Sequence, residues 1–257
     1  MSIVDNVNAV RERIAAAARR CGRSPGDVAL MAVTKTFGPD AIRAAYEAGQ
    51  RLFGENRVQE FTAKAPALRD LQDAAFHMIG HLQTNKAAKV AEIFSAVDSV
   101  DSLHLAEKLN AAARKLNRRI PVLVELNLGG EESKSGMRVE QQQSKGCHPD
   151  PERARRAEGE GPAFQELEQL LLAAARLDHL DFRGLMTIPP FTDDPDGARS
   201  YFRRLREIRD QIAARNLPGI GMDTLSMGMS HDFEVAIEEG STCVRLGAAI
   251  FGQRSKP

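Results

Sequence analysis

Strand-like runs of apolar residues alternate with helix-capable stretches along most of this 257-residue chain. Parallel strands need crossover connections, which are usually helices, and eight such units in a chain of roughly this length close into a ring. We therefore predict an α/β fold, a single (β/α)8 TIM barrel, with a doubly wound open sheet as the alternative. The predicted strands are Val28–Thr34, Arg51–Gly54, Ala75–Ile79, Ala96–Val100, Pro121–Leu128, Phe182–Ile188, Asp223–Met227 and Thr242–Leu246.

An extra helix is predicted before the first strand, over residues 4–20. Apolar residues recur there at helical spacing, and a Cys-Gly pair ends the pattern. The apolar face comprises Val7, Val10, Ile14 and Ala17.

The segment 139–162 interrupts the alternation. It is polar, contains Pro and Gly, and is nearly free of large apolar residues. Such a stretch buries too little surface to offset the entropy lost on ordering. We predict one domain over residues 1–257 with a flexible insertion at 139–162, for which a role as a lid is the alternative.

The charge balance and the termini exclude several classes of function. Lys plus Arg and Asp plus Glu each number 35, so no overall field favours nucleic acid or an anionic membrane. The chain starts with no signal peptide and contains no apolar run of ~18 residues, so we expect a cytoplasmic protein that does not bind membranes. The 3 cysteines are scattered, and no metal-ligand spacing such as HExxH occurs, so neither disulfides nor a metal site is predicted.

Polar residues gather where the predicted strands end, which is where barrels place their active sites. Lys35 follows an apolar run and precedes a turn, and Arg245 would place a permanent cation at the mouth of the last strand. The ordinary explanations are a solvated lysine and an arginine paired with a carboxylate of the barrel. The other strand ends carry Glu55-Asn56, Gly80-His81, Asp101, Asn127, Met186-Thr187 and the run Ser226–Ser230.

A phosphate site is predicted in the loops after the last two strands. The run Ser226-Met227-Gly228-Met229-Ser230 offers hydroxyls and backbone N–H groups, and barrels commonly bind phosphate at this position. Ser230 and Gly247 are the best candidates. A Gly/Ser turn that only caps a helix is the structural alternative.

An amine, a phosphate site and an arginine together indicate pyridoxal 5′-phosphate (PLP). Lys35 would bond to the aldehyde of the cofactor. Arg245 would face the nitrogen of the heterocycle and would favour the neutral, nucleophilic form of the amine.

Two further residues have open roles. Asn56 could hydrogen-bond a ring hydroxyl, with Glu55 and Arg57 flanking the site, but a helix N-cap is the ordinary explanation for an Asn there. His81 is either a general base or a loop histidine with its hydrogen bonds satisfied.

Six motifs carry a resemblance to a known family over roughly residues 5–254, without the insertion. They are Ala32–Lys35, Phe53–Asn56, His77–Lys86, Gly184–Ile188, Leu225–Ser230 and Val244–Gly252. With them the chain resembles the pyridoxal phosphate homeostasis proteins, of the alanine racemase amino-terminal-domain-like group. The resemblance implies a fold-type III barrel in which Lys35 forms the Schiff base and Arg245 faces the pyridine nitrogen.

The resemblance also implies the rest of the cofactor site. Ser230 and the backbone of Gly247 and Ala248 would hold the phosphate. Further cofactor-binding residues would be Asn56, His81, Ser226, Met227 and Gly228.

Two departures from the family pattern concern the phosphate end of the site. His231 stands where the family usually has an acid. Ala248 stands where it usually has Thr, which removes one hydroxyl but leaves the backbone N–H, so we expect weaker cofactor retention at most.

The expected activity follows from what a racemase needs. Alanine racemases take a second acid/base group from a carboxyl-terminal β-domain, and this sequence ends just past the eighth predicted strand. We therefore predict a monomeric protein that stores PLP and delivers it, with PLP-dependent apo-enzymes as candidate partners and little or no turnover. The alternative is a PLP-dependent amino-acid racemase, with Lys35 and His81 as its two bases.

Overall fold

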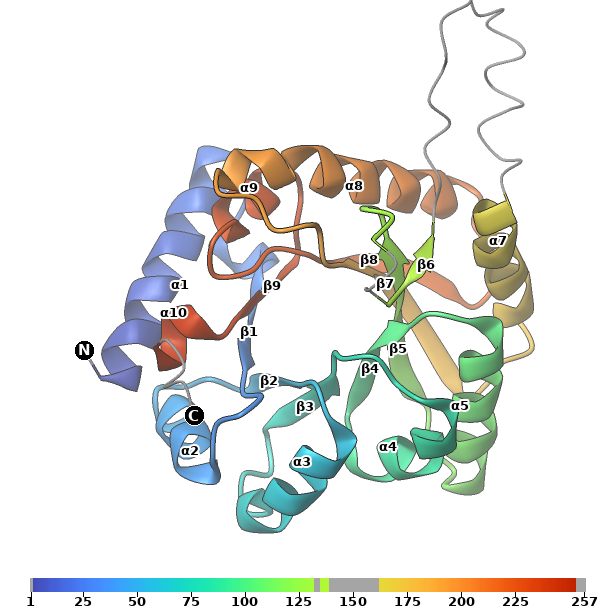
Figure 1. Cartoon of the computed structure of the whole chain (residues 1–257), viewed down its shortest axis with the longest axis horizontal. Helices are drawn as coiled ribbons and strands as arrows, with labels where there is room; N and C mark the ends of the chain where they lie inside the picture. Colours follow the sequence, from blue (N-terminus) through green and yellow to red (C-terminus); the bar gives the residue numbers. More distant parts are fainter. Residues whose placement is uncertain (1, 132–134, 139–161, 253–257) are drawn as a thin grey trace, which may run out of the picture.

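A computed structural model describes residues 2–131, 135–138 and 162–252, and shows a closed barrel of parallel strands surrounded by helices (Figure 1). The barrel strands follow the ring order β4-β3-β2-β1-β9-β8-β7-β5, and the pairing of β4 with β5 closes the ring. The predicted (β/α)8 barrel is confirmed, and the closure excludes the open sheet. The strands are β1 Ala29–Val33, β2 Leu52–Glu55, β3 Ala75–Met78, β4 Ala96–Val100, β5 Ile120–Asn127, β6 Met137–Arg138, β7 Leu180–Thr187, β8 Ile220–Ser226 and β9 Cys243–Leu246.

The strand boundaries differ from the prediction mainly in β6, β7 and β8. The two-residue β6 was not predicted; it pairs with the last two residues of β5. In β7 the register shifts around Arg183, so the alternation that marks a strand is interrupted there. The strand predicted to begin at Asp223 begins at Ile220 in the structure. Gly221 hid this start, because glycine in a sequence usually indicates a turn.

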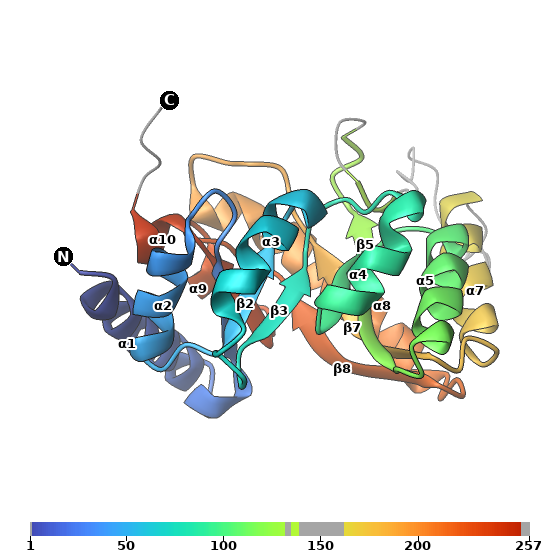
Figure 2. The ribbon, with the colours of Figure 1, turned by 90° about the horizontal axis from the view of Figure 1, so that it is seen from below.

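The helices form the outer layer, and Figures 1 and 2 show them around the strands. No helix in the described ranges is long and apolar enough to cross a membrane. Most of the segment 139–162 lies outside the described residues, and α7 begins at its last residue. The helices are α1 Ile3–Arg20, α2 Pro39–Glu47, α3 Val58–Lys64, α4 Ala87–Ile93, α5 Leu103–Lys115, α7 Pro162–Ala174, α8 Arg199–Ala214, α9 Phe233–Glu238 and α10 Ala248–Phe251.

Helix α1 is the predicted extra helix, and its four predicted apolar-face residues are all buried. Ser2 and Asp5 form a capping box at its start, which satisfies backbone N–H groups that the first turn leaves free. The helix lies beside α10 in both views of the ribbon (Figures 1 and 2). The Asn6 side chain joins these two helices through a 2.8 Å hydrogen bond to the Ile250 carbonyl.

Side chains of β1 alternate between two apolar compartments, as the period of a strand requires. Leu30 and Ala32 belong to the large core between strands and helices. Met31 and Val33 belong to a small cluster inside the barrel. Lys35 continues this inward-facing series beyond the end of β1.

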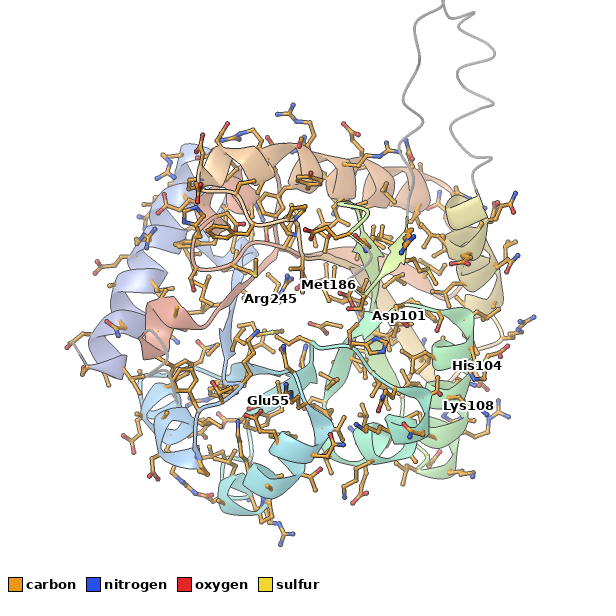
Figure 3. All side chains as sticks on the ribbon, viewed as in Figure 1. Glu55, Asp101, His104, Lys108, Met186 and Arg245 are labelled. Carbon is orange, nitrogen blue, oxygen red and sulfur yellow. The ribbon has the colours of Figure 1, made fainter. Side chains whose placement is uncertain are left out.

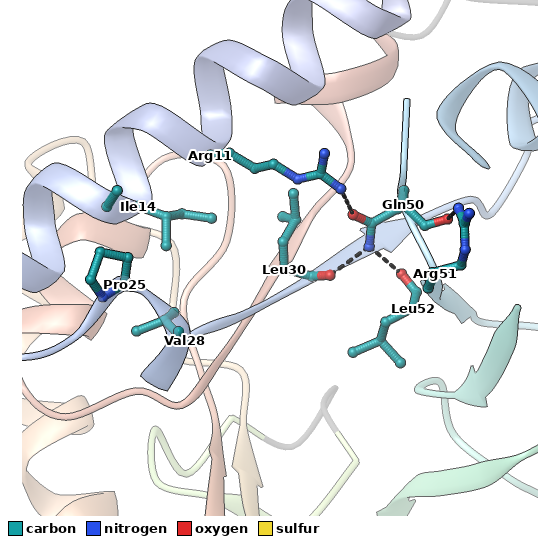
Figure 4. Close-up of a pocket in the computed structure, with 10 residues that line it drawn as sticks. Arg11, Ile14, Pro25, Val28, Leu30, Gln50, Arg51 and Leu52 are labelled. Atoms are coloured by element: carbon teal, nitrogen blue, oxygen red, sulfur yellow. Dashed lines mark hydrogen bonds between the residues drawn. The ribbon is translucent and has the colours of Figure 1, made fainter. Parts of the chain in front are cut away.

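Gln50 ties α1 to the strands at the amino-terminal end of the barrel (Figure 4). Its amide is 3% exposed and donates to the carbonyls of Leu30 (2.5 Å) and Leu52 (2.7 Å). Its side-chain oxygen accepts from Arg11, whose guanidinium also bonds to the Ala48 carbonyl at 2.7 Å. One buried amide therefore connects β1, β2 and α1.

Replacing Gln50 with leucine is expected to lower the free energy of unfolding by about 2 kcal/mol, because two backbone carbonyls lose their donor. Urea unfolding followed by circular dichroism measures this loss. Gln72→Leu, at an exposed position, is the matched control and should change stability by less than ~0.5 kcal/mol. Equal stabilities of the two variants would contradict the assigned role of Gln50.

Candidate functional site

A cavity of about 320 Å³ lies at the carboxyl ends of β1, β2, β3, β7, β8 and β9 and among the loops that follow them. Six of the ten predicted cofactor-binding residues line it: Lys35, Asn56, Ser230, Arg245, Gly247 and Ala248. The parallel barrel explains this gathering, because the carboxyl ends of all its strands meet on one face.

Lys35 projects from the turn that follows β1. The preceding inward-facing residue, Val33, and Ile79 contribute apolar surface to the same cavity. Thr36 then reverses the chain with a φ of 70°, a value that β-branched residues rarely adopt. Phe37 follows at the rim, its ring 4.8 Å from that of Phe251.

Arg245 is a buried cation that lines the same cavity as Lys35, with only 4% of its surface exposed. Both hydrogen bonds described for its guanidinium go to neutral oxygens, Ser226 Oγ at 2.7 Å and the Thr187 carbonyl at 2.8 Å. Burial lowers the pKa of Arg245, partly offset by more distant carboxylates such as Asp98 and Glu125. Figure 3 shows Arg245 and Met186 inside the ring of strands. A ligand with an anionic or lone-pair acceptor suits this cation.

Small residues form another part of the cavity lining. Ser230 Oγ accepts a 3.2 Å hydrogen bond from the Ala249 amide and so fixes the start of α10. Gly247 precedes that helix, and its carbonyl accepts the amides of the following turn. The arrangement leaves room for a compact anion beside a hydroxyl and backbone, which is what a phosphate group needs.

The remaining predicted residues lie outside the cavity lining. Ser226 is fully buried beneath Arg245, and Met227 is fully buried in the core. Gly228 shapes the loop: its φ is 95°, a Cβ there would come within 2.6 Å of Ala236, and its carbonyl accepts the Arg245 amide. The side chain of His81 is 60% exposed and hydrogen-bonded to Asp101 at 3.1 Å.

Two sequence interpretations are corrected at the end of β2. Asn56 does not cap α3, because the N-cap is Arg57. Glu55 does not flank the cavity; it is fully buried on the α3 side of the strand, where it bonds to Thr34 and Lys64 (Figure 3). The alternation of side chains along β2 sends Asn56 to the inside and Glu55 to the outside.

The sequence prediction missed part of the cavity rim. Phe191 is 74% exposed and lies against the ring of His231 at 5.5 Å. The His231 ring nitrogen Nε2 donates to the Asp193 carbonyl at 3.0 Å. The available sequence signal for Phe191 was an aromatic residue that directly follows two prolines after a predicted strand. The other lining residues not predicted are Val33, Phe37, Ile79, Ile188, Met229 and Gly252.

Other titratable groups lie inside the barrel but outside this cavity. Among the described residues, no group of His, Cys, Asp and Glu side chains is placed to hold a metal ion. At the amino-terminal end, burial opposes the charged form of His77, but the Asp98 carboxylate at 3.1 Å prevails and raises the pKa of His77. Burial raises the pKa of the Cys243 thiol to about 12, so this thiol is unreactive near neutral pH.

Comparison with known proteins places the chain in a family. Residues 6–148 and 159–255 match the family described as alanine racemase, N-terminal domain. A pyridoxal phosphate homeostasis protein of Aquifex aeolicus is 40% identical over 254 residues, covering 99% of both chains. PipY of Synechococcus elongatus PCC7942, solved with PLP bound, is 34% identical with a TM-score of 0.75, covering 98% of this chain and 100% of that chain.

The relation to alanine racemases themselves is one of fold. The alanine racemase of Streptomyces lavendulae is 19% identical with a TM-score of 0.63, and the match covers 99% of this chain but 58% of that enzyme. With 40% identity over almost its whole length to a curated relative, this chain belongs to the family of pyridoxal phosphate homeostasis proteins.

Proposed function

We propose that this protein binds PLP through Lys35 and serves in its homeostasis, storing the cofactor and delivering it to PLP-dependent apo-enzymes, with little or no catalytic turnover. The observation that carries the proposal is that one cavity is lined by Lys35, by the buried Arg245 and by Ser230, Gly247 and Ala248. Its volume of about 320 Å³ suits a ligand of this size. The names of the curated relatives and the PLP-bound PipY structure support the same ligand.

Different residues of the cavity lining suit different parts of the cofactor. PLP supplies an aldehyde, and the Lys35 amine would add to its carbon while the aldehyde oxygen leaves as water. Arg245 would donate to the ring nitrogen and keep it unprotonated, which makes the ring a weak electron sink. Ser230 and the backbone of Gly247 and Ala248 would hold the phosphate. Asn56 would contact the ring from β2.

The exposed setting of His81 bears on the racemase alternative. His81 bonds to Asp101 outside the cavity lining, and a second base must reach the face of the substrate opposite Lys35. Storage and delivery is therefore the function that the geometry favours. Assays of D- and L-amino acids separate the two, because robust turnover that is lost in Lys35→Ala would establish a racemase.

The visible spectrum of the protein with added PLP tests the proposal. We expect an absorption band, and borohydride reduction followed by peptide mass mapping should locate the label on Lys35. Lys35→Ala should lose the band completely, whereas Lys108→Ala, at an exposed position on α5, should retain it. A label on another lysine, or no band in the wild-type protein, would overturn the assignment.

A further inference from the structure

A buried charged cluster lies directly behind Lys35, between the end of β2 and helix α3. Lys64 is 8% exposed, although lysine is rarely buried, and Glu55 is fully buried. The Lys64 ammonium lies 3.0 Å from Glu55 Oε1 and 2.6 Å from Glu60 Oε1. Removing such groups from water is costly, and buried ion pairs add little net stability. The cluster therefore calls for an explanation other than stability.

On one side, the cluster holds the residue that precedes Lys35. The Lys64 ammonium donates to the Thr34 carbonyl at 3.0 Å. The Thr34 hydroxyl donates to Glu55 Oε1 at 2.7 Å. Both polar groups of Thr34 that face α3 are thus fixed.

On the other side, the cluster holds the residue that follows Lys35. Glu60 Oε1 accepts the Thr36 amide at 2.6 Å. Thr36 is the residue with a φ of 70°, and a strained backbone conformation persists only where its surroundings impose it. The hydrogen bond to Glu60 is such a constraint.

We propose that Lys64, Glu55 and Glu60 are positioning residues for Lys35, which hold the peptide groups on both sides of it and so aim its amine into the cavity. The inference rests on the proposed function, in which Lys35 carries the cofactor. None of the three lines the cavity, so they act through the backbone and not through contact with the ligand.

The charge states of the two carboxyl groups agree with this role. Partial burial opposes the ionised form of Glu60, but hydrogen bonds from Lys64 and the Thr36 amide prevail and lower the pKa of Glu60. Burial raises the pKa of Glu55, and Thr34 and Lys64 counteract it. Glu60 is accordingly ionised at neutral pH and is a strong acceptor for the Thr36 amide.

The test compares a ligand that reacts with Lys35 with one that does not. PLP reacts, whereas pyridoxamine 5′-phosphate has no aldehyde and reports only on the cavity. Glu60→Ala is expected to slow the growth of the PLP band by at least ~10-fold, because a displaced nucleophile reacts slowly. Its dissociation constant for pyridoxamine 5′-phosphate should stay within about twofold of wild type, since the cavity lining is unchanged.

Two further variants sharpen the test. Glu60→Gln keeps an acceptor for the Thr36 amide and should restore the rate of capture to within about threefold of wild type. Glu92→Ala removes an exposed carboxylate that pairs with Lys89 at 3.0 Å, and it should change neither readout. If Glu60→Ala does not fold, the double variant Glu60→Ala/Thr36→Gly replaces it, because glycine also removes the backbone strain at residue 36. We expect the double variant to capture PLP at least ~10-fold more slowly than the wild type.

The outcomes separate the inference from the proposed function. PLP capture at the wild-type rate in Glu60→Ala, or an equal loss of both ligands together with a lower melting temperature, would leave the cluster a structural role only. In either case the wild-type band on Lys35 would still support the proposed function. A wild-type protein without any band would overturn both.

Discussion

Replacing Glu125 with glutamine is expected to stabilise the protein above neutral pH, by up to about 3 kcal/mol. Glu125 lies inside the barrel with 3% of its surface exposed. Burial raises the pKa of Glu125 from 4.5 to about 7, although hydrogen bonds from the Ser135 hydroxyl oppose the shift. Ionising this group in the folded protein is therefore costly.

The sign of the pH dependence follows from the direction of this shift. The folded state binds the proton more tightly than the unfolded state, so stability is full below the unfolded pKa of 4.5 and is lost as the pH rises through about 7. Glutamine has nearly the same shape, accepts a hydrogen bond from Ser135 and cannot ionise. The free energy of unfolding of the variant should therefore equal that of the wild type near pH 4.5 and exceed it above about pH 7.

Urea unfolding at about pH 5 and about pH 8.5, on either side of the upper pKa, measures the difference. Glu92→Gln is the matched control: Glu92 is exposed, so this variant should have the same stability as the wild type at each of the two pH values. A Glu125→Gln variant that is less stable than wild type at the higher pH would contradict the expectation. It would show that the charge of Glu125 is favourably paired, with Arg245 and His81 as the groups that favour its ionised form.

Replacing Gly80 with alanine is expected to cost on the order of 3 kcal/mol of folding free energy and to disturb the candidate site. A Cβ at Gly80 would lie 2.4 Å from the carbonyl oxygen of Asn56 and 2.9 Å from its Cα, both backbone atoms. The Gly80 carbonyl is held on its other side by the Ser99 hydroxyl at 2.7 Å. The chain after β3 therefore cannot retreat easily, and Asn56 must move.

Urea unfolding measures the loss of stability, and pyridoxamine 5′-phosphate binding measures the displacement of Asn56, which lines the cavity. Gly26→Ala is the control, because its Cβ would meet only Ser24 Oγ at an ordinary 3.7 Å. We expect that variant to differ from wild type by less than ~1 kcal/mol. Similar stabilities for the two alanine variants would contradict the argument from close packing.

The sequence predicted the features that depend on periodicity and strand ends. Lys35 and Arg245 were both singled out because each ends an apolar run, and β1 and β9 are neighbours with Met31 opposite Arg245. Because the two strands are parallel neighbours, their carboxyl ends lie side by side, and residues at these ends line one cavity. The roles assigned to these residues remain predictions until the ligand is measured.

The features that depend on burial were not predictable. Glu60 and Lys64 have the spacing of a surface ion pair on a helix, and nothing local shows that α3 turns Lys64 toward the barrel. Glu125 sits in a strand whose alternation is hidden by apolar residues on both faces, so its inward direction was not visible. In both cases the decisive neighbours, such as Thr34 and Ser135, belong to other segments of the chain.

The neighbouring strands β1 and β9 come from opposite ends of the chain, so the two sides of the cavity are synthesised at different times. Lys35 leaves the ribosome early and Arg245 late, and the bond from Asn6 to Ile250 joins residues 244 positions apart. A growing chain therefore exposes the lysine long before its partners exist. The cavity is completed only when the last strand inserts beside the first, so a nascent or truncated chain has Lys35 without the cavity that it lines in the folded protein.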